Sequence, residues 1–258
     1  MKTVIRITFV AVLGAALATA LAPSQPAAGT SYNTVKQKLL EGKQVFGATL
    51  TTGDVEAAKK MAESGYDYFW IEMQHSPMTY ETAAALIKGL QGHPAVPFIR
   101  VPDATEGDIQ KATDIGALGI IVPMVETVEK AMAAVRYAKY PPVGRRSTGS
   151  MQAPSLWGKD YRKTANDNVM VVIQIESPEG VANAEKIAAV PGVDVVFAAS
   201  VDLSNFTGME IGQPKYEDLI TRIKDATLKA GKWLAGPGSW SGRKGFTFFQ
   251  GRGAYKEI

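Results

Sequence analysis

The sequence contains no cysteine and only two histidines among its 258 residues. The lack of cysteine excludes disulfides, thiolate nucleophiles and cysteine-ligated zinc, but it leaves the cellular compartment open. The formal net charge is only +3, and no run of basic residues is present. We therefore expect no nucleic-acid partner, and charge indicates little else about partners.

Long hydrophobic runs are missing except at the N-terminus. Lys2 and Arg6 give a basic start, and an alanine-rich apolar run follows over residues 7–22. This order is typical of a cleaved secretory signal, and the run is short for the alternative, an uncleaved membrane anchor. We predict a signal peptide and spacer at 1–29 and a single domain at 30–258, in a periplasmic or secreted protein that leaves the membrane after cleavage.

The rest of the chain alternates short apolar runs with amphipathic stretches. Strands are predicted at 45–50, 68–73, 96–101, 118–122, 169–175, 193–198, 233–235 and 246–250. Helices are predicted at 32–41, 54–64, 79–90, 105–114, 127–138, from 176 to about 189, and 216–230. This α/β pattern favours a (β/α)8 TIM barrel. A doubly wound open sheet is the alternative, and the missing glycine-rich fingerprint after the first strand disfavours it.

Two stretches depart from the alternation. Residues 140–168 are predicted to be one long irregular segment, and such loops are usually functional. It contains Arg145 and Arg146, which either bind an anionic substrate or have a structural or interfacial role. After residue 235 there is room for hardly one helical turn before the last strand. We therefore expect abbreviated C-terminal helices, either because partner subunits cover that side or because the chain is a truncated variant.

Two acids follow neighbouring predicted strands. Glu176 ends the run VMVVIQIES, and Asp202 follows the next strand in ASVDLS. A carboxylate at the end of a buried strand is costly unless it is paired or bound to a metal, and parallel strands end at one mouth of a barrel. Hard oxygen ligands favour Mg²⁺ or Mn²⁺ over zinc, with Co²⁺ as a further candidate. The alternative is that each acid forms a surface ion pair.

Other polar residues follow the strands that end at the same mouth. After the second strand come Glu72 and His75, and a histidine at a barrel rim is either a general base or a core-capping residue bonded to backbone. Arg100 ends the third strand, where a buried guanidinium needs a carboxylate or an oxyanion. Gln174 ends the fifth. The spacing of Asp114, at the end of a helix, predicts only local hydrogen bonds.

These residues together resemble the HpcH/HpaI class II family, the metal-dependent pyruvate aldolases. The resemblance is carried, in order, by WIEMQHSP, FIRVP, ATDIGALGIIVPMVET, YPPVGRRSTGS, VIQIES and SVDLS, between about residues 45 and 236. It implies a TIM barrel of the phosphoenolpyruvate/pyruvate-domain type and a homo-oligomer.

The resemblance also implies a role for individual positions. Glu176 and Asp202 match the metal-binding acids of the family. His75 matches the catalytic histidine, and Asp114 matches the aspartate paired with it. Arg100 matches the arginine that contacts the pyruvate oxygen.

Two further positions are expected to bind substrate. Gln174 matches a glutamine of the pyruvate site, and Ser200 stands where the family has a glycine–proline pair. The implied reaction cleaves a 2-keto-4-hydroxy acid to pyruvate and an aldehyde through an enolate, with His75 moving the proton of the 4-hydroxyl. The alternatives are decarboxylation of oxaloacetate or cleavage of a malyl thioester through the same enolate, and a non-catalytic periplasmic binding protein on the same barrel.

Overall fold

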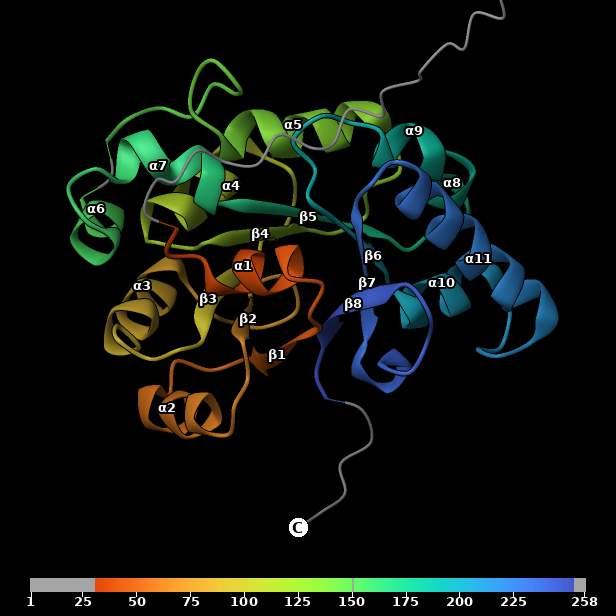
Figure 1. The fold of residues 1–258 in the computed structure, drawn as a ribbon, viewed down its shortest axis with the longest axis horizontal. Helices are drawn as coiled ribbons and strands as arrows, with labels where there is room; N and C mark the ends of the chain where they lie inside the picture. The colour runs from red at the N-terminus through yellow and green to blue at the C-terminus, as the bar shows by residue number, and fades with distance from the viewer. Residues whose placement is uncertain (1–30, 150, 253–258) are drawn as a thin grey trace, which may run out of the picture.

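Eight parallel strands close into a barrel in the computed structural model, which describes residues 31–149 and 151–252 (Figure 1). Each strand pairs with its neighbours in sequence, and β8 pairs back with β1. The predicted (β/α)8 barrel is therefore confirmed. The predicted signal peptide and spacer, residues 1–29, lie outside the described residues. Within the described part, no helix has the length and apolar character needed to cross a membrane.

The strands are short and largely apolar. Their bounds are β1 (Val45–Leu50), β2 (Tyr68–Glu72), β3 (Val96–Arg100), β4 (Gly119–Val122), β5 (Met170–Ile175), β6 (Val195–Ala198), β7 (Trp233–Pro237) and β8 (Phe246–Gln250). Every residue of β2, β4, β5 and β6 is buried. Burial on both faces explains why these strands are continuous apolar runs instead of alternating patterns.

Helices surround the barrel (Figure 1). Their bounds are α1 (Thr34–Leu40), α2 (Val55–Glu63), α3 (Tyr80–Gly89), α4 (Glu106–Asp114), α5 (Val128–Ala138), α6 (Gln152–Trp157), α7 (Tyr161–Asn168), α8 (Pro178–Ala182), α9 (Ala184–Ala188), α10 (Ser200–Thr207), α11 (Pro214–Lys229) and the 3₁₀ turn η1 (Gly238–Trp240). Asp54, Thr79, Thr105 and Thr127 each accept a backbone N–H at the start of a helix. These caps explain why α2 to α5 begin where the sequence predicts.

The structure corrects three predictions about helices. The segment predicted to be irregular contains α6 and α7. The helix after β5 is divided into α8 and α9 at Asn183. α10 is missing from the prediction because its apolar residues do not mark one face: Leu203 is buried, whereas Val201 and Phe206 are 70% and 52% exposed. The expected abbreviation between β7 and β8 is confirmed, since only η1 lies there.

Aromatic rings fill the inside of the barrel. The ring of Tyr68 lies 5.0 Å from that of Phe98 and 4.5 Å from that of Phe248, measured between centroids. Two strand glycines make room for these rings. A Cβ on Gly47 would lie 2.2 Å from the Tyr68 ring, and a Cβ on Gly119 would lie 1.8 Å from the Phe98 ring. Only glycine fits at these two positions because real Cβ contacts are never so short.

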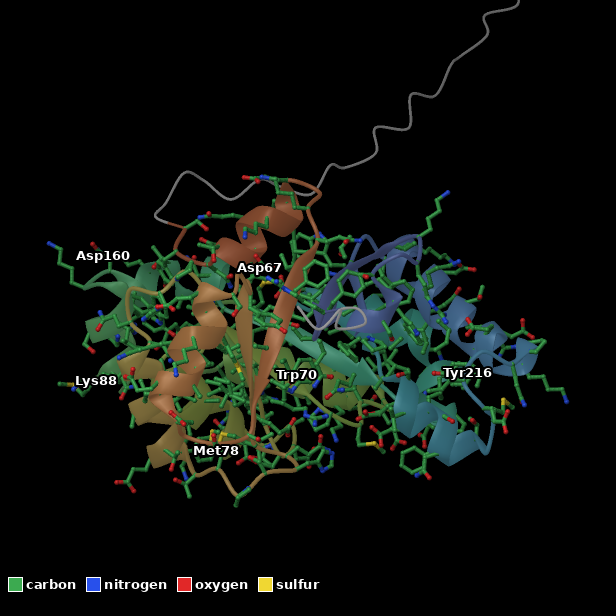
Figure 2. All side chains as sticks on the ribbon, turned by 90° about the horizontal axis from the view of Figure 1, so that it is seen from below. Asp67, Trp70, Met78, Lys88, Asp160 and Tyr216 are labelled. Carbon is green, nitrogen blue, oxygen red and sulfur yellow. The ribbon has the colours of Figure 1, made fainter. Side chains whose placement is uncertain are left out.

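The aromatic layer forms the floor of the barrel mouth. Side chains on a strand alternate between its two faces, so residues two apart point the same way. On β2, Tyr68, Trp70 and Glu72 therefore form one inward row that ends at the carboxyl end of the strand. Trp70 is fully buried near the middle of the molecule (Figure 2). Glu72, two residues later, is the first acid of this row and lies at the mouth.

Candidate active site

The carboxyl ends of the strands carry the predicted polar residues. In the register of β2 and β3, Glu72 lies opposite Arg100. Gln174 is the fifth residue of β5, and Glu176 follows that strand directly. Barrel enzymes bind substrates at this rim. The structure therefore places these four residues at one mouth.

Glu176 and Asp202 meet at this mouth. β5 and β6 are neighbours, and Asp202 lies in the first turn of α10, which follows β6. Burial, together with the charge of Asp202 and a hydrogen bond with its side chain, raises the pKa of Glu176 to about 7, against opposing contributions from the Met124 N–H and Arg100. Two carboxyl groups this close do not both ionise easily, so the pair favours a shared proton or a bound cation.

The loop after β4 supports Glu176. The N–H of Met124 donates to Oε1 of Glu176 at 2.5 Å, and the N–H of Val125 donates to the carbonyl oxygen of Gln174 at 3.0 Å. Met124 has a φ of 52°, which is uncommon for a residue other than glycine. Strained backbone of this kind is often found at functional sites. Here it aims an N–H group at the acid of the site.

Arg100 is held between two polar side chains. Its Nε donates to Oε2 of Glu72 at 2.6 Å, its Nη2 contacts the same oxygen, and its Nη1 lies 3.4 Å from Oε1 of Gln174. Burial acts to raise the pKa of Glu72, but hydrogen bonds and the positive charge of Arg100, with backbone N–H groups, lower it overall. Glu72 is therefore an ionised carboxylate, and the arginine faces the acid pair at Glu176.

His75 lies in the turn after β2. Its backbone N–H donates to Oε1 of Glu72 at 3.0 Å, and that of Gln74 donates to the same oxygen at 2.7 Å. The hydroxyl of Ser76 donates to the carbonyl oxygen of Glu72. The turn is anchored while the residue itself is exposed. This arrangement leaves the imidazole accessible to a substrate that enters the mouth.

Ser200 is buried at the start of α10. Its carbonyl oxygen accepts the hydroxyl of Tyr216 at 3.0 Å. α10 starts after Ala199, whose side chain makes no capping hydrogen bond. The first N–H groups of a helix attract anions. Ser200 therefore lies where backbone donors suit a substrate carboxylate.

The structure does not bring Asp114 to His75 within one chain. α4 begins after the carboxyl end of β3 and runs back along the barrel, so Asp114 lies at the opposite rim. The chain reaches this rim soon after α4, where the N–H of Leu118 donates to the carbonyl oxygen of Pro97 near the start of β3, at 2.8 Å. A strand of this length separates the two rims by about 15 Å. The pairing implied by the family resemblance is therefore not made inside a single chain, because helices run antiparallel to the strands they follow.

Asp114 instead binds Arg146. Nη2 of Arg146 donates to its carboxylate at 2.7 Å, and Nη1 donates to the hydroxyl of Tyr161 at 2.9 Å. The guanidinium also lies 4.5 Å from the ring centroid of Tyr140. The side chain of Arg146 has no exposed surface. These contacts favour the structural interpretation of Arg146 over binding of substrate at the mouth.

The donor set suits a hard divalent cation whose coordination is only partly supplied by protein. Glu176 and Asp202 offer carboxylate oxygens, and no cluster of three or more acidic, histidine or cysteine side chains occurs in the part of the chain that is described. Mg²⁺ commonly binds through one or two carboxylates and completes its shell with water and substrate. Two acids beside an open mouth fit that mode.

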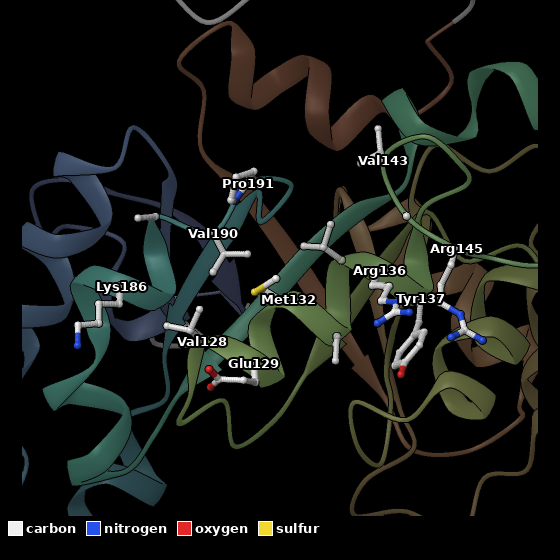
Figure 3. Close-up of a pocket in the computed structure, with 14 residues that line it drawn as sticks. Val128, Glu129, Met132, Arg136, Tyr137, Val143, Arg145, Lys186, Val190 and Pro191 are labelled. Carbon is white, nitrogen blue, oxygen red and sulfur yellow. The ribbon is translucent and has the colours of Figure 1, made fainter.

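A separate groove lies outside the barrel (Figure 3). It has a volume of about 1020 Å³ and runs along α5 and α9, with Met132, Val143 and Val190 among its apolar residues and Arg136 and Lys186 among its charged ones. None of the residues assigned to the mouth lines it. The groove is therefore distinct from the candidate active site.

A parallel (β/α)8 barrel with paired acids, an arginine and an accessible histidine at its carboxyl-end mouth defines an enzyme that acts on a small acidic molecule. The model of the HpcH/HpaI aldolase/citrate lyase family matches residues 50–233. The chain belongs to this family and is an enzyme of the carbon–carbon lyase class.

Individual relatives agree with this assignment. The chain is 35% identical over 186 residues to the 2-dehydro-3,6-dideoxy-6-sulfogluconate aldolase of Pseudomonas putida, covering 71% of this chain and 72% of the relative. It is 36% identical over 210 residues to the hydroxypyruvate/pyruvate aldolase of Delftia acidovorans, covering 78% and 76%. The crystal structure of an HpcH/HpaI aldolase/citrate lyase family protein from Burkholderia cenocepacia superposes with a TM-score of 0.79 at 31% identity, covering 86% of this chain and 93% of that chain. The family predicted from the sequence motifs is confirmed.

Proposed function

We propose that this chain is a divalent-metal-dependent aldolase that cleaves a 2-keto-4-hydroxy acid into pyruvate and an aldehyde. The observation that carries the proposal is the meeting of Glu176 and Asp202 at the barrel mouth, beside Arg100. The carboxyl group of Glu176 is buried and lies beside Asp202, so its ionised form is costly unless a cation or proton lies between the two acids. The aldolase names of relatives that span most of the chain support the same reaction class.

Each residue of the mouth has a binding task in this proposal. Glu176 and Asp202 hold Mg²⁺, Mn²⁺ or Co²⁺, which when bound supplies Lewis-acid stabilisation of negative charge on the substrate. Arg100 and Gln174 orient the keto oxygen. The first N–H groups of α10, at Ser200, receive the carboxylate of the keto acid.

The exposed histidine moves the proton. His75 accepts the proton of the 4-hydroxyl group, the C3–C4 bond breaks, and the aldehyde leaves. The electron pair of that bond passes into the pyruvate enolate, whose negative charge Arg100 stabilises. A proton then returns to C3 to give pyruvate. A general base positioned in this way contributes about 100- to 10,000-fold to a rate.

Pyruvate release from a panel of 2-keto-4-hydroxy acids tests the proposal. Activity is expected to disappear after treatment with a chelator and to return with Mg²⁺, Mn²⁺ or Co²⁺. Glu176→Ala is expected to abolish it, and Glu185→Gln, which breaks an exposed pair with Lys229, serves as the control. Chelator-insensitive turnover, or full activity of the Glu176→Ala variant, contradicts the proposal. Faster turnover of oxaloacetate than of every aldol substrate supports the decarboxylase alternative.

We also propose that the mature enzyme is exported and forms a homo-oligomer. Export rests on the basic start and apolar run within residues 1–29. N-terminal sequencing of protein from a periplasmic extract is expected to start after that run, and an intact Met1 in the cytosol contradicts export. Light scattering on the purified protein tests assembly, and a monomeric mass contradicts it.

A further inference from the structure

Glu72 connects two parts of the candidate site, and no role for it follows from the sequence. Its Oε2 accepts hydrogen bonds from Arg100 and from the indole Nε1 of Trp70, the latter at 3.2 Å. Its Oε1 accepts the backbone N–H groups of Gln74 and His75. Each carboxylate oxygen therefore serves a different group. Oε2 holds the guanidinium of Arg100, and Oε1 holds the turn that carries His75.

We propose that Glu72 is a positioning residue that keeps Arg100 and the His75 turn in one fixed arrangement for the reaction. The inference rests on the proposed aldolase function, because its consequence for turnover is measured in that reaction. Glu72 need not touch the substrate. It acts through the guanidinium and through the backbone of the turn.

The contacts of Arg100 show why this position matters. Nε and Nη2 both bind Glu72, and the remaining nitrogen, Nη1, faces Gln174. The guanidinium carbon also lies 5.4 Å from the ring centroid of Trp70. A planar guanidinium held on two sides loses little freedom when it binds an oxyanion. Without Glu72, the arginine is expected to turn toward the acids at the mouth.

The chemistry of the two oxygens defines the key variant. An amide has only one acceptor oxygen, so the Glu72→Gln side chain can satisfy either Arg100 or the turn of His75, but not both. Its NH₂ group would face a donor on the other side. Glu72→Asp keeps both acceptor oxygens on a chain that is shorter by one methylene group. Glu72→Gln therefore keeps the length of the side chain but removes one acceptor and the charge, whereas Glu72→Asp keeps both acceptors and the charge on a shorter side chain.

The first experiment compares turnover in the wild-type protein and the two variants, each loaded with Mn²⁺. Glu72→Gln is expected to lower kcat about 100-fold, the effect of displacing a reacting group by about 1 Å, with a smaller change in KM because the metal-binding acids remain. Glu72→Asp is expected to recover at least about a tenth of the wild-type kcat. The control is Glu217→Gln, which breaks a Glu–Arg pair of similar geometry with Arg243, at 2.7 and 3.1 Å, and is expected to leave kcat unchanged.

A second measurement follows the arginine itself by NMR. The Nε–H signal of Arg100, assigned with an Arg100→Lys variant, is expected to exchange with solvent more slowly than that of Arg243 in the wild-type protein, and to lose this protection in Glu72→Gln. This readout requires no turnover. If the wild-type protein is inactive on every aldol substrate, the proposed function fails while the NMR result still tests the positioning of Arg100.

Specific results would overturn the inference. A folded Glu72→Gln variant with wild-type kcat overturns it, and so does a Glu72→Asp variant that is no better than Glu72→Gln. If Glu72→Gln does not fold, rapid exchange of the Arg100 Nε–H in the wild-type protein overturns the inference by itself.

Discussion

Replacing Glu176 by glutamine is expected to stabilise the metal-free protein at alkaline pH. The folded-state pKa of Glu176 is about 7, against an ordinary value of 4.5. A shift of this size corresponds to about 3 kcal/mol of unfavourable free energy once the group is ionised, at 1.36 kcal/mol for each pKa unit. The sign follows from the direction of the shift. Because the folded-state pKa is raised, the stability that the protonated Glu176 contributes is complete below pH 4.5, and it is lost as the pH rises from there through 7.

The glutamine side chain matches the geometry of the protonated acid. Its oxygen can accept the N–H of Met124, and its NH₂ group can donate to Asp202 in place of the shared proton. We therefore expect Glu176→Gln to exceed the wild-type protein by roughly 1–3 kcal/mol at pH 8 in the presence of a chelator, after allowing for imperfect hydrogen bonds. At pH 4.5 the two proteins are expected to be nearly equal. Mn²⁺ is expected to stabilise only the wild-type protein.

Urea unfolding at pH 4.5 and pH 8, with chelator and with Mn²⁺, measures these differences. Glu185→Gln is the matched control, since Glu185 is exposed and paired with Lys229 at 3.2 Å, and its difference from wild type should not follow this pH pattern. If Glu176→Gln is less stable than the wild-type protein, and by the same free energy of unfolding at pH 8 as at pH 4.5, the argument that burial and Asp202 disfavour the charge is refuted.

Three further predictions concern other parts of the barrel. Gly119→Ala is expected to lower the free energy of unfolding in urea by about 1–3 kcal/mol, because its Cβ meets the Phe98 ring at 1.8 Å. Gly107→Ala, in open space on α4, should be neutral or stabilising. Equal effects of the two substitutions would contradict the packing argument. Asp114→Ala is expected to lower stability by about 2–3 kcal/mol, because it removes a partner of the buried guanidinium of Arg146, and an unchanged unfolding midpoint would contradict this. His75→Ala is expected to reduce kcat about 100-fold or more with an unchanged Tm, because the residue is exposed; a large loss of Tm would indicate the core-capping role instead.

The number, order and approximate bounds of the strands follow from the sequence. A strand buried on both faces must be a continuous apolar run, so β1 and β8 are predicted to the residue and the others within two residues at each end. The mouth follows from the same reasoning. Arg100, Gln174 and Glu176 come at the ends of their strands in sequence, and parallel strands of a barrel all end at one rim.

The helical connections are less predictable. The segment that becomes α6 and α7 contains proline, glycine and several polar residues, and its helices are stabilised by contacts such as that of the Trp157 indole, which donates to the carbonyl oxygen of Gly116 at 2.9 Å. α10 likewise begins at Ser200 without a side-chain cap at Ala199, and its apolar residues do not mark one face. Short helices depend on tertiary packing more than on local preference.

The sequence by itself determined the barrel and the set of polar residues at its mouth, because burial imposes a pattern that can be read along a single strand. The tertiary structure alone decided which residues contact one another across elements. It paired Asp114 with Arg146 at the far rim, and it joined Glu72 to Arg100 and to the turn of His75. Such pairings depend on the direction in which each helix runs and on the register between strands, and neither is encoded in the spacing of residues along the chain.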